Sequence, residues 1–272
     1  MKTQIGKFKG WSIFLLDSQS EDTRIQAFLD ERFGRDTDDE FKESYRFLIC
    51  ENSRGKLVAT YRYTVGDEVA KRNTEKYYKT YDIYKRIRSR SMELGRTAAD
   101  PTDKMALYAI LSAGVGPAIY NHMKHNKVVY VTGQPTLQDQ EWSRKEQLAI
   151  YSLFWQSFGS KFVTPYKPAF TEKELTSSYR FSPYHQGGKE ELTKLLHSMG
   201  CKKKPVLFYF YADRVSHGSG IRVGLPTENE SLGGTEMFTC ASVKDFSLAT
   251  KRDFFGPAFL QDFKFIQDLE AE

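Results

Sequence analysis

The run from Ser91 to Ala99 constrains the fold of this chain more than any other stretch. It has the apolar character of a buried strand, yet it contains one carboxylate, Glu93, and one guanidinium, Arg96. Ionisable groups inside a central strand are costly unless they are paired or used. Helix-start residues follow at once at 101–103, ahead of the apolar run 105–111. Because the N–H groups that open a helix can hold an anion, we expect the functional site at this junction.

Hydrophobic periodicity predicts a chain in which strands and helices alternate. The expected elements, in chain order, are a strand at 11–16, a helix opening at 20–22, hairpin strands at 45–50 and 57–64, a full or partial helix at 74–89, the strand at 91–99, a helix at 103–124, a strand at 127–132, helices at 138–158 and 188–199, and strands at 206–212 and 237–243. Gly114, Gly116 and Pro117 should kink or split the helix at 103–124. This order predicts an α/β fold, a mixed sheet flanked by helices with a parallel crossover in the middle.

Length and composition favour one domain over residues 1–272. The chain is 40% hydrophobic and includes 20 Phe and 16 Tyr, enough for a substantial core. We expect an extra helical segment at about 138–190 and a long loop, rich in Gly and Ser, at about 214–235.

Composition also narrows the setting of the chain. No window approaches the roughly 20 apolar residues of a membrane span, and the apolar run at 13–16 is too short for a signal peptide. The three cysteines are far apart in the sequence, which indicates a reducing cytoplasm rather than a disulfide scaffold. His122 and His125 have no third ligand in sight, so no metal site is expected. The net charge of +5 is compatible with an acidic partner.

The spacing of Glu93 and Arg96 leaves two interpretations open. Residues three apart in a regular strand face opposite sides of a sheet, so only a β-bulge, tolerated at Gly95, would bring both to one site. In the functional interpretation Glu93 removes a proton from an acceptor amine and Arg96 orients a carboxylate. In the structural interpretation Glu93 forms a buried ion pair with Arg62 or Arg96. Spacing alone does not decide between them.

Three motifs resemble one branch of a known superfamily. They are Ala59-Thr60-Tyr61-Arg62-Tyr63, then Glu93-Leu94-Gly95-Arg96 about thirty residues later, then Tyr130-Val131-Thr132-Gly133 after the expected helix. Together they look like the acyl-carrier-protein-dependent branch of the GNAT N-acyltransferases. That branch includes acyl-homoserine-lactone synthases, ornithine N-acyltransferases of lipid synthesis and N-acyl amino acid synthases. The Glu-Leu-Gly-Arg tetrad most resembles the last two groups, and the resemblance covers about residues 20–135.

The resemblance implies a set of acceptor-binding residues beyond Glu93 and Arg96. Arg24 and Phe28 have the four-residue spacing seen in the lactone synthases, and Asp36 and Asp39 resemble their acidic pair. The tryptophan of those enzymes is missing here, with Phe33 the nearest substitute. The implied acceptor-binding residues are therefore Arg62, Arg24, Phe28, Asp39 and Thr132.

The same resemblance implies a splayed central strand that admits the pantetheine arm of a thioester. The residues implied for this arm are Thr97, Ala98 and Ala99, through their backbone, and Lys104, Met105 and Ala106, whose turn would hold its phosphate. Residues 101–106 contain no glycine, unlike the phosphate loop of acetyl-CoA enzymes of this fold, which argues against tight CoA binding. No permanently bound cofactor is implied: the donor would be an acyl-phosphopantetheine thioester on acyl carrier protein, or acyl-CoA.

The stretch 71–90 is strongly basic, with tyrosines interleaved at helical spacing. Its cations are Lys71, Arg72, Lys76, Lys79, Lys85, Arg86, Arg88 and Arg90. It could be a solvated helix face, a docking surface for an acidic acyl carrier protein, or a nucleic-acid contact. Tyrosines at helical spacing would pack inward, which disfavours the nucleic-acid interpretation.

These observations predict a cytoplasmic N-acyltransferase. It would transfer a fatty acyl group from a carrier-protein thioester to the amine of an amino-acid-like acceptor, with Glu93 as base or water-organiser and Arg96 and Arg62 as orienting cations. Three alternatives stay open: an acyl-homoserine-lactone (autoinducer) synthase, an acetyl-CoA-dependent N-acetyltransferase of a small molecule, and a non-catalytic basic binding module. The expected partners are an acidic acyl carrier protein and the small acceptor.

Overall fold

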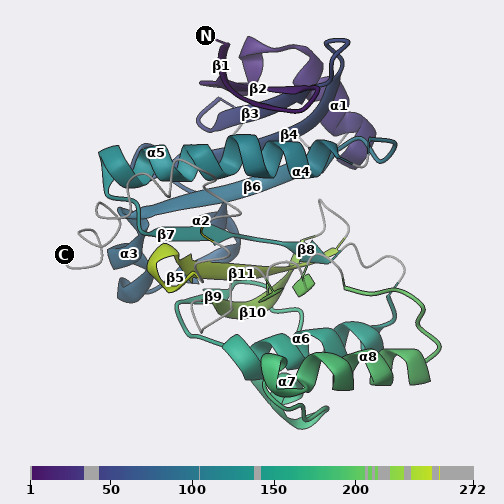
Figure 1. The fold of residues 1–272 in the computed structure, drawn as a ribbon. Coiled ribbons are helices and arrows are strands. Elements are labelled where there is room, and N and C mark those ends of the chain that lie inside the picture. The colour runs from purple at the N-terminus through teal and green to yellow at the C-terminus, as the bar shows by residue number, and fades with distance from the viewer. Residues whose placement is uncertain are drawn as a thin grey trace. The chain divides into compact units, whose positions relative to one another are not determined.

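The computed structural model describes residues 2–33, 43–103, 105–137, 142–205, 208–209, 212–213, 221–229, 234–246 and 251. The chain divides into two compact units, and each is described by itself. Unit 1 comprises Met1–Arg72, Ile87–Val131 and Ser242–Glu272, and unit 2 comprises Asn73–Arg86 and Thr132–Ala241. The single domain expected from the sequence stays a prediction. The architecture is mixed α/β, with mostly antiparallel strands flanked by helices (Figure 1).

Unit 1 is built on an antiparallel run of strands. Its order is β1 (Thr3–Phe8), β2 (Trp11–Leu16), β3 (Arg46–Glu51), β4 (Leu57–Val65) and β6 (Ser91–Ala99). Strands β2 and β6 have the bounds that the sequence predicts, whereas β1 was not expected. Every residue of β4 is buried, and β4 lies between β3 and β6.

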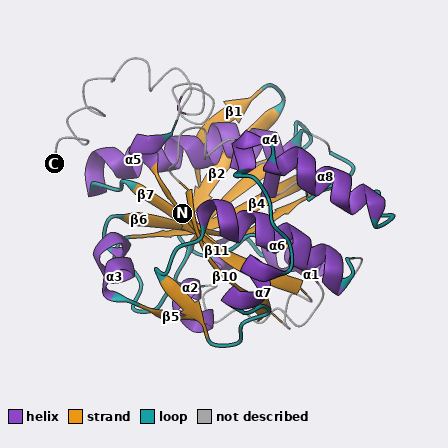
Figure 2. Ribbon diagram, turned by 90° about the horizontal axis from the view of Figure 1, so that it is seen from below, coloured by secondary structure: helices purple, strands orange, loops and turns teal. Residues whose placement is uncertain are grey.

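Helices cover both faces of these strands. Helix α1 (Arg24–Phe33) follows the 3₁₀ turn η1 (Gln19–Glu21) and covers one face. There its residues Ile25 and Phe28 pack with Phe47 of β3. On the other face Gly114 packs against Leu48, because neighbouring strand residues point to opposite sides. Gly114 belongs to a helical rod made of α4 (Ala106–Ile110), the π-helical segment Leu111–Val115 and α5 (Gly116–Asn126). Figure 2 shows α4 and α5 in line along one side of the strands.

The kink predicted at Gly114, Gly116 and Pro117 takes the form of that π-helical segment, and the rod is not interrupted. The rod ends at Lys127, whose left-handed φ of 53° terminates α5. The strand expected at 127–132 therefore begins later, as β7 (Tyr130–Gly133), which runs from unit 1 into unit 2.

Unit 2 contains short strands and the remaining helices. Its elements are α2 (Asn73–Tyr77), β5 (Tyr78–Thr80), most of α3 (Asp82–Arg88), β8 (Thr136–Leu137), α6 (Arg144–Phe158), β9 (Val163–Pro165), α7 (Glu172–Ser177), η3 (Tyr184–Gln186), α8 (Gly188–Ser198), β10 (Ile221–Asn229) and β11 (Gly234–Ser242), whose last residue belongs to unit 1 and precedes η5 (Val243–Asp245). Strand β11 pairs antiparallel with β10 and β8, and β5 pairs antiparallel with β9. Segment 74–89 is thus partly helical, as predicted. Helix α6 begins at a capping box of Ser143 and Glu146, later than the predicted start at 138; residues 138–141 lie outside the described part.

Two predictions in unit 2 are wrong. The strand expected at 206–212 is helical wherever it is described, at Phe208, Tyr209 and Ala212. The Tyr209 N–H donates to the Pro205 carbonyl at 3.0 Å, a helical i to i−4 bond. A continuous apolar run such as this one fits a buried helix as well as a buried strand, and periodicity cannot separate them.

The long loop expected at 214–235 contains strand β10. Gly224 and Pro226 read as turn residues, but an irregularity between Val223 and Pro226 keeps both in the strand. Gly224 is required by close packing, because a Cβ there would lie 2.9 Å from a methyl of Val163. Residues 214–220 and 230–233 lie outside the described part of the chain.

Candidate functional site

A β-bulge interrupts β6 next to Gly95, as the functional interpretation of the sequence expects. Gly95 pairs with Arg62 and Ala98 pairs with Thr60, so Arg96 and Thr97 together lie opposite the single residue between them on β4. The predicted bulge is confirmed, but the unusual backbone is at Arg96, whose φ is 43°, and not at Gly95. A non-glycine residue in the left-handed region is strained, and such strain is concentrated at functional sites.

The regular pairing ahead of the bulge places Glu93 and Arg62 on one face of the unit 1 strands. Glu93 pairs across the strands with Thr64, and Arg62 pairs with Gly95, so the side chains of β4 and β6 at these positions share the face that α1 covers. Glu93 is 2% exposed and Arg62 is 3% exposed. Both charged groups are therefore held inside the protein, where each needs polar partners.

Tyr45 links the two charged groups. Its hydroxyl donates a hydrogen bond to Oε1 of Glu93 at 2.7 Å, and the Arg62 guanidinium lies over its ring, 4.8 Å from the centroid. The aromatic face thus attracts the cation while the hydroxyl fixes the carboxylate. Sequence reasoning missed Tyr45, because its alternation with Phe47 and Ile49 indicates nothing beyond a core position.

Arg96 differs from these residues in exposure. It is half-buried, as are its neighbours Gly95 and Thr97, whereas the first four residues of β6 are all buried. Strand β6 is therefore closer to solvent at the bulge than along the segment that contains Glu93.

The turn expected to hold a phosphate has its own carboxylate. Asp103 Oδ1 accepts a hydrogen bond from the Met105 N–H at 3.2 Å, and the Asp103 carbonyl accepts one from the Ala106 N–H at 3.1 Å. Its Oδ2 accepts from Nε1 of Trp11 at 2.9 Å. Lys104 lies outside the described residues. A phosphate could reach these amides only by displacing Asp103, whose negative charge would repel it.

Asp100 directly follows the end of β6 at Ala99 and fixes that end. Ala98, the residue before Ala99, lies in the core. It is buried, and its carboxylate accepts hydrogen bonds from Lys56 Nζ at 2.7 Å and from both the hydroxyl and the N–H of Thr102, at 2.7 and 2.9 Å. The Lys56 contact, followed by those of Thr102, holds the pKa of Asp100 well below its usual range. Asp100 is therefore a structural anion at the junction.

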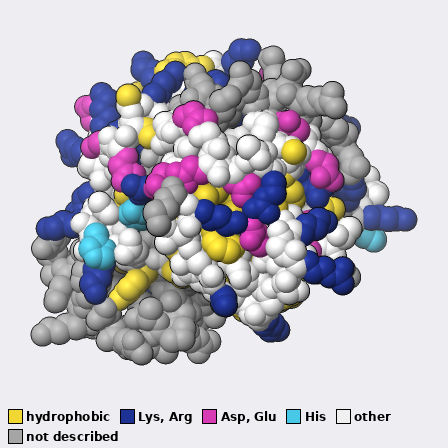
Figure 3. All heavy atoms as spheres, turned by 90° about the horizontal axis from the view of Figure 1, so that it is seen from above, with side chains coloured by type: hydrophobic (Ala, Val, Ile, Leu, Met, Phe, Trp, Pro, Cys, Tyr) yellow, Lys and Arg dark blue, Asp and Glu magenta, His cyan; other side chains and the backbone are white. Residues whose placement is uncertain are grey.

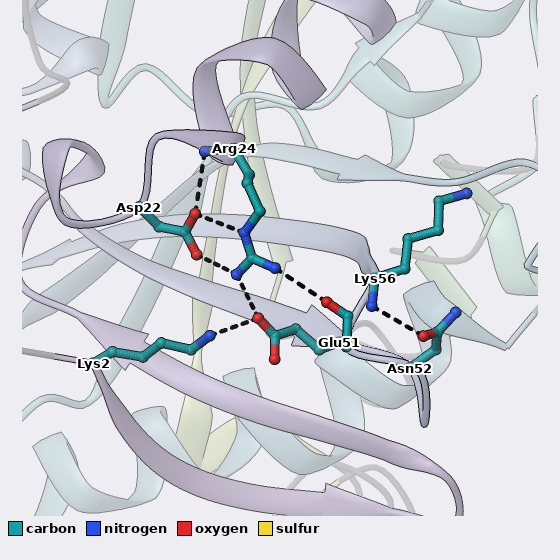
Figure 4. A network of polar contacts seen from close by, with 7 residues as sticks. Lys2, Asp22, Arg24, Glu51, Asn52 and Lys56 are labelled. Carbon is teal, nitrogen blue, oxygen red and sulfur yellow. Dashed lines mark hydrogen bonds and ion pairs between the residues drawn. The ribbon is translucent and has the colours of Figure 1, made fainter.

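Arg24, expected to bind the acceptor, lies in an ion-pair network at the start of α1 (Figure 4). Its guanidinium donates to both oxygens of Asp22, to Oε1 of Glu51 at 2.5 Å and to the Gly55 carbonyl at 3.1 Å. Lys2 also donates to Glu51, at 2.5 Å. Arg24 lowers the pKa of Asp22, and although burial alone would raise the pKa of Glu51, Lys2 and Arg24 together lower it. Arg24 thus fastens α1 to the hairpin of β3 and β4.

Phe28, also expected to bind the acceptor, lies in the same buried cluster as Tyr45. Phe28 is a core residue, 8% exposed, with the Arg32 guanidinium 5.1 Å from its ring centroid. Thr132 belongs to unit 2, where it is buried and its hydroxyl has no hydrogen-bond partner among the described residues. Asp36 and Asp39 lie outside the described part of the chain.

The basic stretch 71–90 is partly structural. Arg72 is fully buried and donates to the Ser91 hydroxyl at 2.7 Å and to the carbonyls of Gly66 and Ser91. Arg88 donates to the Val69 carbonyl at 2.7 Å. These two cations hold the backbone and do not form an open basic surface. The face drawn in Figure 3 carries acidic side chains among the basic ones, which weakens a field of one sign over that face.

Among the described residues, no three His, Cys, Asp or Glu side chains lie where they could hold a metal ion together. None of the helices in the described ranges is both long and apolar enough to span a membrane.

The segment that contains Tyr45, Arg62 and Glu93 matches a known domain. No curated protein sequence matches the chain. Among solved structures, TofI in an apo form and TofI in a ternary complex with an inhibitor and MTA each have a TM-score of 0.36 and 10% identity, over 88% of this chain and 95% of theirs. The ribosomal-protein-S5-alanine acetyltransferase from Vibrio fischeri has a TM-score of 0.31 and 8% identity, over 52% of this chain and 76% of its own. A sequence model of the acetyltransferase (GNAT) domain matches residues 23–105, which contain α1, the β3–β4 hairpin and the bulged strand β6.

Proposed function

We propose that the protein is an N-acyltransferase whose reaction takes place beside the bulge of β6. The observation that carries this proposal is the buried carboxylate of Glu93, held by Tyr45 next to Arg62, inside the segment that matches a GNAT domain. A carboxylate fixed in this way is suited to accept a proton from an amine, directly or through one water molecule.

The proposed reaction joins the carbonyl carbon of the donor thioester to the amine of the acceptor. The amine nitrogen attacks the thioester carbonyl, a C–N bond forms, and Glu93 takes the proton that the nitrogen loses. The tetrahedral intermediate then collapses, the C–S bond breaks, and the thiolate leaves and is protonated. The protein contributes mainly by positioning the two substrates and by stabilising the oxyanion with backbone N–H groups near the bulge.

The donor we propose is an acyl thioester on acyl carrier protein. Asp103 already accepts the amide of Met105 at the turn where the pyrophosphate of CoA would be expected, which disfavours CoA. The acceptor we propose is an amino-acid-like amine, and the product an N-acyl amino acid or its cyclised lactone. Acetyl transfer from acetyl-CoA is the second candidate, because the matched domain is described as an acetyltransferase.

Mass spectrometry of the products tests this proposal. The protein is mixed with C4 to C18 acyl carrier proteins, or with the matching CoA thioesters, and a pool of amino acids. N-acylation of one acceptor from the carrier thioester is the expected result, and transfer only from acetyl-CoA would favour the second candidate. Absence of turnover with every donor would leave a binding module without acyltransferase activity.

A pair of variants assigns the role of Glu93. Glu93→Gln should slow turnover at least roughly tenfold, the low end of a general-base contribution, while Gln can still accept the Tyr45 hydrogen bond and keep the fold. Glu31→Gln on α1 is the matched control, since the Glu31 side chain is 67% exposed and forms an ion pair with the adjacent Arg32. Equal rates for the two variants would remove Glu93 from the mechanism.

A further inference from the structure

Strands β5 and β9 of unit 2 form a two-stranded ribbon with two unlike faces. Tyr78 pairs with Pro165, and Thr80 pairs with Val163 two positions along. These residues share one face, which is the inner one because Tyr78 is 1% and Val163 is 2% exposed. The Tyr78 hydroxyl also accepts a hydrogen bond from the Phe238 N–H at 3.0 Å, which ties the ribbon to β11. The opposite, outer face of the ribbon is therefore turned away from the core.

The outer face carries aromatic side chains, although the solvated face of an antiparallel sheet is usually polar. Lys79 pairs with Thr164 at the centre of this face. Tyr166 follows on the same face, two positions after Thr164 and opposite Tyr77, whose carbonyl accepts the Tyr166 N–H at 3.0 Å. Tyr81 lies at the other end, with its hydroxyl oxygen 3.0 Å from Thr164 Oγ1, within hydrogen-bond distance.

The tyrosines of the outer face are open to solvent. Tyr166 is 63% exposed and Tyr81 is 39% exposed. Single exposed aromatic residues need no explanation, but aromatic residues grouped on one face mark an interaction surface. Tyrosine is also enriched at protein interfaces and among the residues that contribute most to binding. The outer face of the ribbon therefore has the composition of a docking surface.

The charge around this face is mainly positive. Exposed lysines lie on and beside both strands: Lys76, Lys79, Lys161 and Lys167. Two flanking carboxylates already have partners, since Glu172 pairs with Lys161 at 3.2 Å and Asp82 pairs with Lys85 at 3.4 Å. Aromatic residues at the centre with cations around them fit a partner whose surface is acidic.

The tyrosine rings favour a protein partner over a nucleic acid. Nζ of Lys79 lies over the ring of Tyr81, 5.9 Å from its centroid, and Nζ of Lys76 lies over the ring of Tyr77, 5.7 Å from its centroid. Single-stranded nucleic acids bind by stacking successive bases on open aromatic faces. A lysine already occupies one face of each of these two rings, which leaves fewer faces for such stacking.

We propose that the outer face of the β5–β9 ribbon is the docking surface for the donor's acidic acyl carrier protein. This inference rests on the proposed N-acyltransferase function. Tyr166 and Tyr81 pack against apolar side chains of the carrier protein, and Lys79 faces its carboxylates. Recognition through the protein part of the donor would also separate it from CoA, which has no such part.

The test compares ribbon variants in a binding assay and a kinetic assay. Tyr166→Ala removes the most exposed ring, Tyr166→Phe keeps it, and Lys79→Glu reverses the central charge. Lys202→Glu is the matched control, because Lys202 is an exposed lysine of unit 2 that belongs to neither strand. The first assay is calorimetric titration with holo acyl carrier protein, without an acyl group, at several salt concentrations. The second is KM for the acyl carrier protein thioester and for the matching acyl-pantetheine thioester.

Tyr166→Ala and Lys79→Glu should each raise Kd for the carrier protein, and KM for its thioester, at least about tenfold. Lys79→Glu should also reduce the salt dependence of binding, because one screened attraction is lost. Tyr166→Phe and Lys202→Glu should stay within about twofold of wild type, and KM for the pantetheine thioester should not change in any variant. If Tyr166→Ala and Lys79→Glu bind the carrier protein as the wild type does, or if the wild type does not bind it, the inference is wrong.

The two proposals fail in distinguishable ways. Acyl transfer from the carrier thioester with an unchanged KM in both ribbon variants would leave the N-acyltransferase function standing and remove the docking surface. Carrier-protein binding that is lost in the ribbon variants, with no acyl transfer from any donor, would keep the docking surface and remove the acyltransferase function.

Discussion

The hydrogen bond from Tyr45 to Glu93 is the contact on which the candidate site depends most. Tyr45→Phe removes one hydroxyl and keeps the ring, so the Arg62 guanidinium keeps the aromatic face that lies 4.8 Å from it. The lost bond is 2.7 Å long and buried, and hydrogen bonds to charged groups contribute roughly 1.5 to 3 kcal/mol. We therefore expect Tyr45→Phe to lower the free energy of unfolding by about 2 kcal/mol.

Urea denaturation of the wild type, Tyr45→Phe, Glu93→Ala and the double variant measures the coupling between the two residues. If the hydroxyl acts on the carboxylate, the two single losses should exceed the loss in the double variant by about 1 kcal/mol or more. Tyr108→Phe is the control for removal of a tyrosine hydroxyl, since Tyr108 is 49% exposed, and its effect should stay within about 0.5 kcal/mol.

Additive losses in this cycle, equal to within about 0.5 kcal/mol, would refute the reasoning, because they would show that the hydroxyl and the carboxylate do not stabilise each other. A loss in Tyr45→Phe that persists unchanged in the Glu93→Ala background would point instead to packing around the ring.

Three shorter predictions concern the end of β6. Arg96→Gly should keep the free energy of unfolding within roughly 1 kcal/mol of wild type, because glycine accepts the positive φ. Arg96→Val introduces a β-branched side chain and should lower the free energy of unfolding by about 2 kcal/mol. Equal stabilities of the two variants in urea would contradict the strain at this position. Asp100→Asn removes a carboxylate whose folded pKa lies below its unfolded value, so its stabilisation is complete above about pH 4 and is lost as pH falls further. The difference in unfolding free energy between wild type and Asp100→Asn should therefore shrink between pH 6 and pH 2, and a constant difference would contradict the role of Lys56. Asp103→Ala frees the Met105 amide and should lower KM for CoA thioesters several-fold without changing KM for carrier-protein thioesters; an unchanged KM for CoA would show that the aspartate does not exclude it.

Strong periodicity made much of the fold predictable. Strands at 11–16 and 91–99 and the helix ending at 158 follow from clean apolar patterns with turn or cap residues at their ends. Strand β10 was missed because Gly224 and Pro226 resemble turn residues, and what keeps them in a strand is the pairing with β11, which is a long-range contact. The helix at Phe208 was missed for a related reason: an all-apolar run has no period to read.

The candidate site was predictable in its charges and not in its contacts. A carboxylate and a guanidinium in one buried strand need an explanation, and this fact identified Glu93 and Arg96. Arg62 followed from the ion-pair alternative and from the resemblance, and the bulge near Gly95 was expected only in the functional interpretation. The hydroxyl of Tyr45 and the carboxylate of Asp103 could not be found in this way. Tyr45 and Glu93 are 48 positions apart in the chain, so their contact depends on the tertiary fold. Asp103 occupies the Met105 N–H only because of the local conformation of the turn, which the sequence pattern does not reveal.

The π-helical segment Leu111–Val115 has a consequence for engineering and for comparison with other chains. One extra residue in a helix rotates everything after it by about 100°, the angle per residue of an α-helix. His122 packs edge-on against Tyr63, with ring centroids 5.6 Å apart, only because α5 has that rotational phase. Deleting a single residue between 111 and 115 would restore a uniform helix and turn His122 away from the strands, so alignments that place a gap elsewhere in this rod would assign the wrong residues to the core.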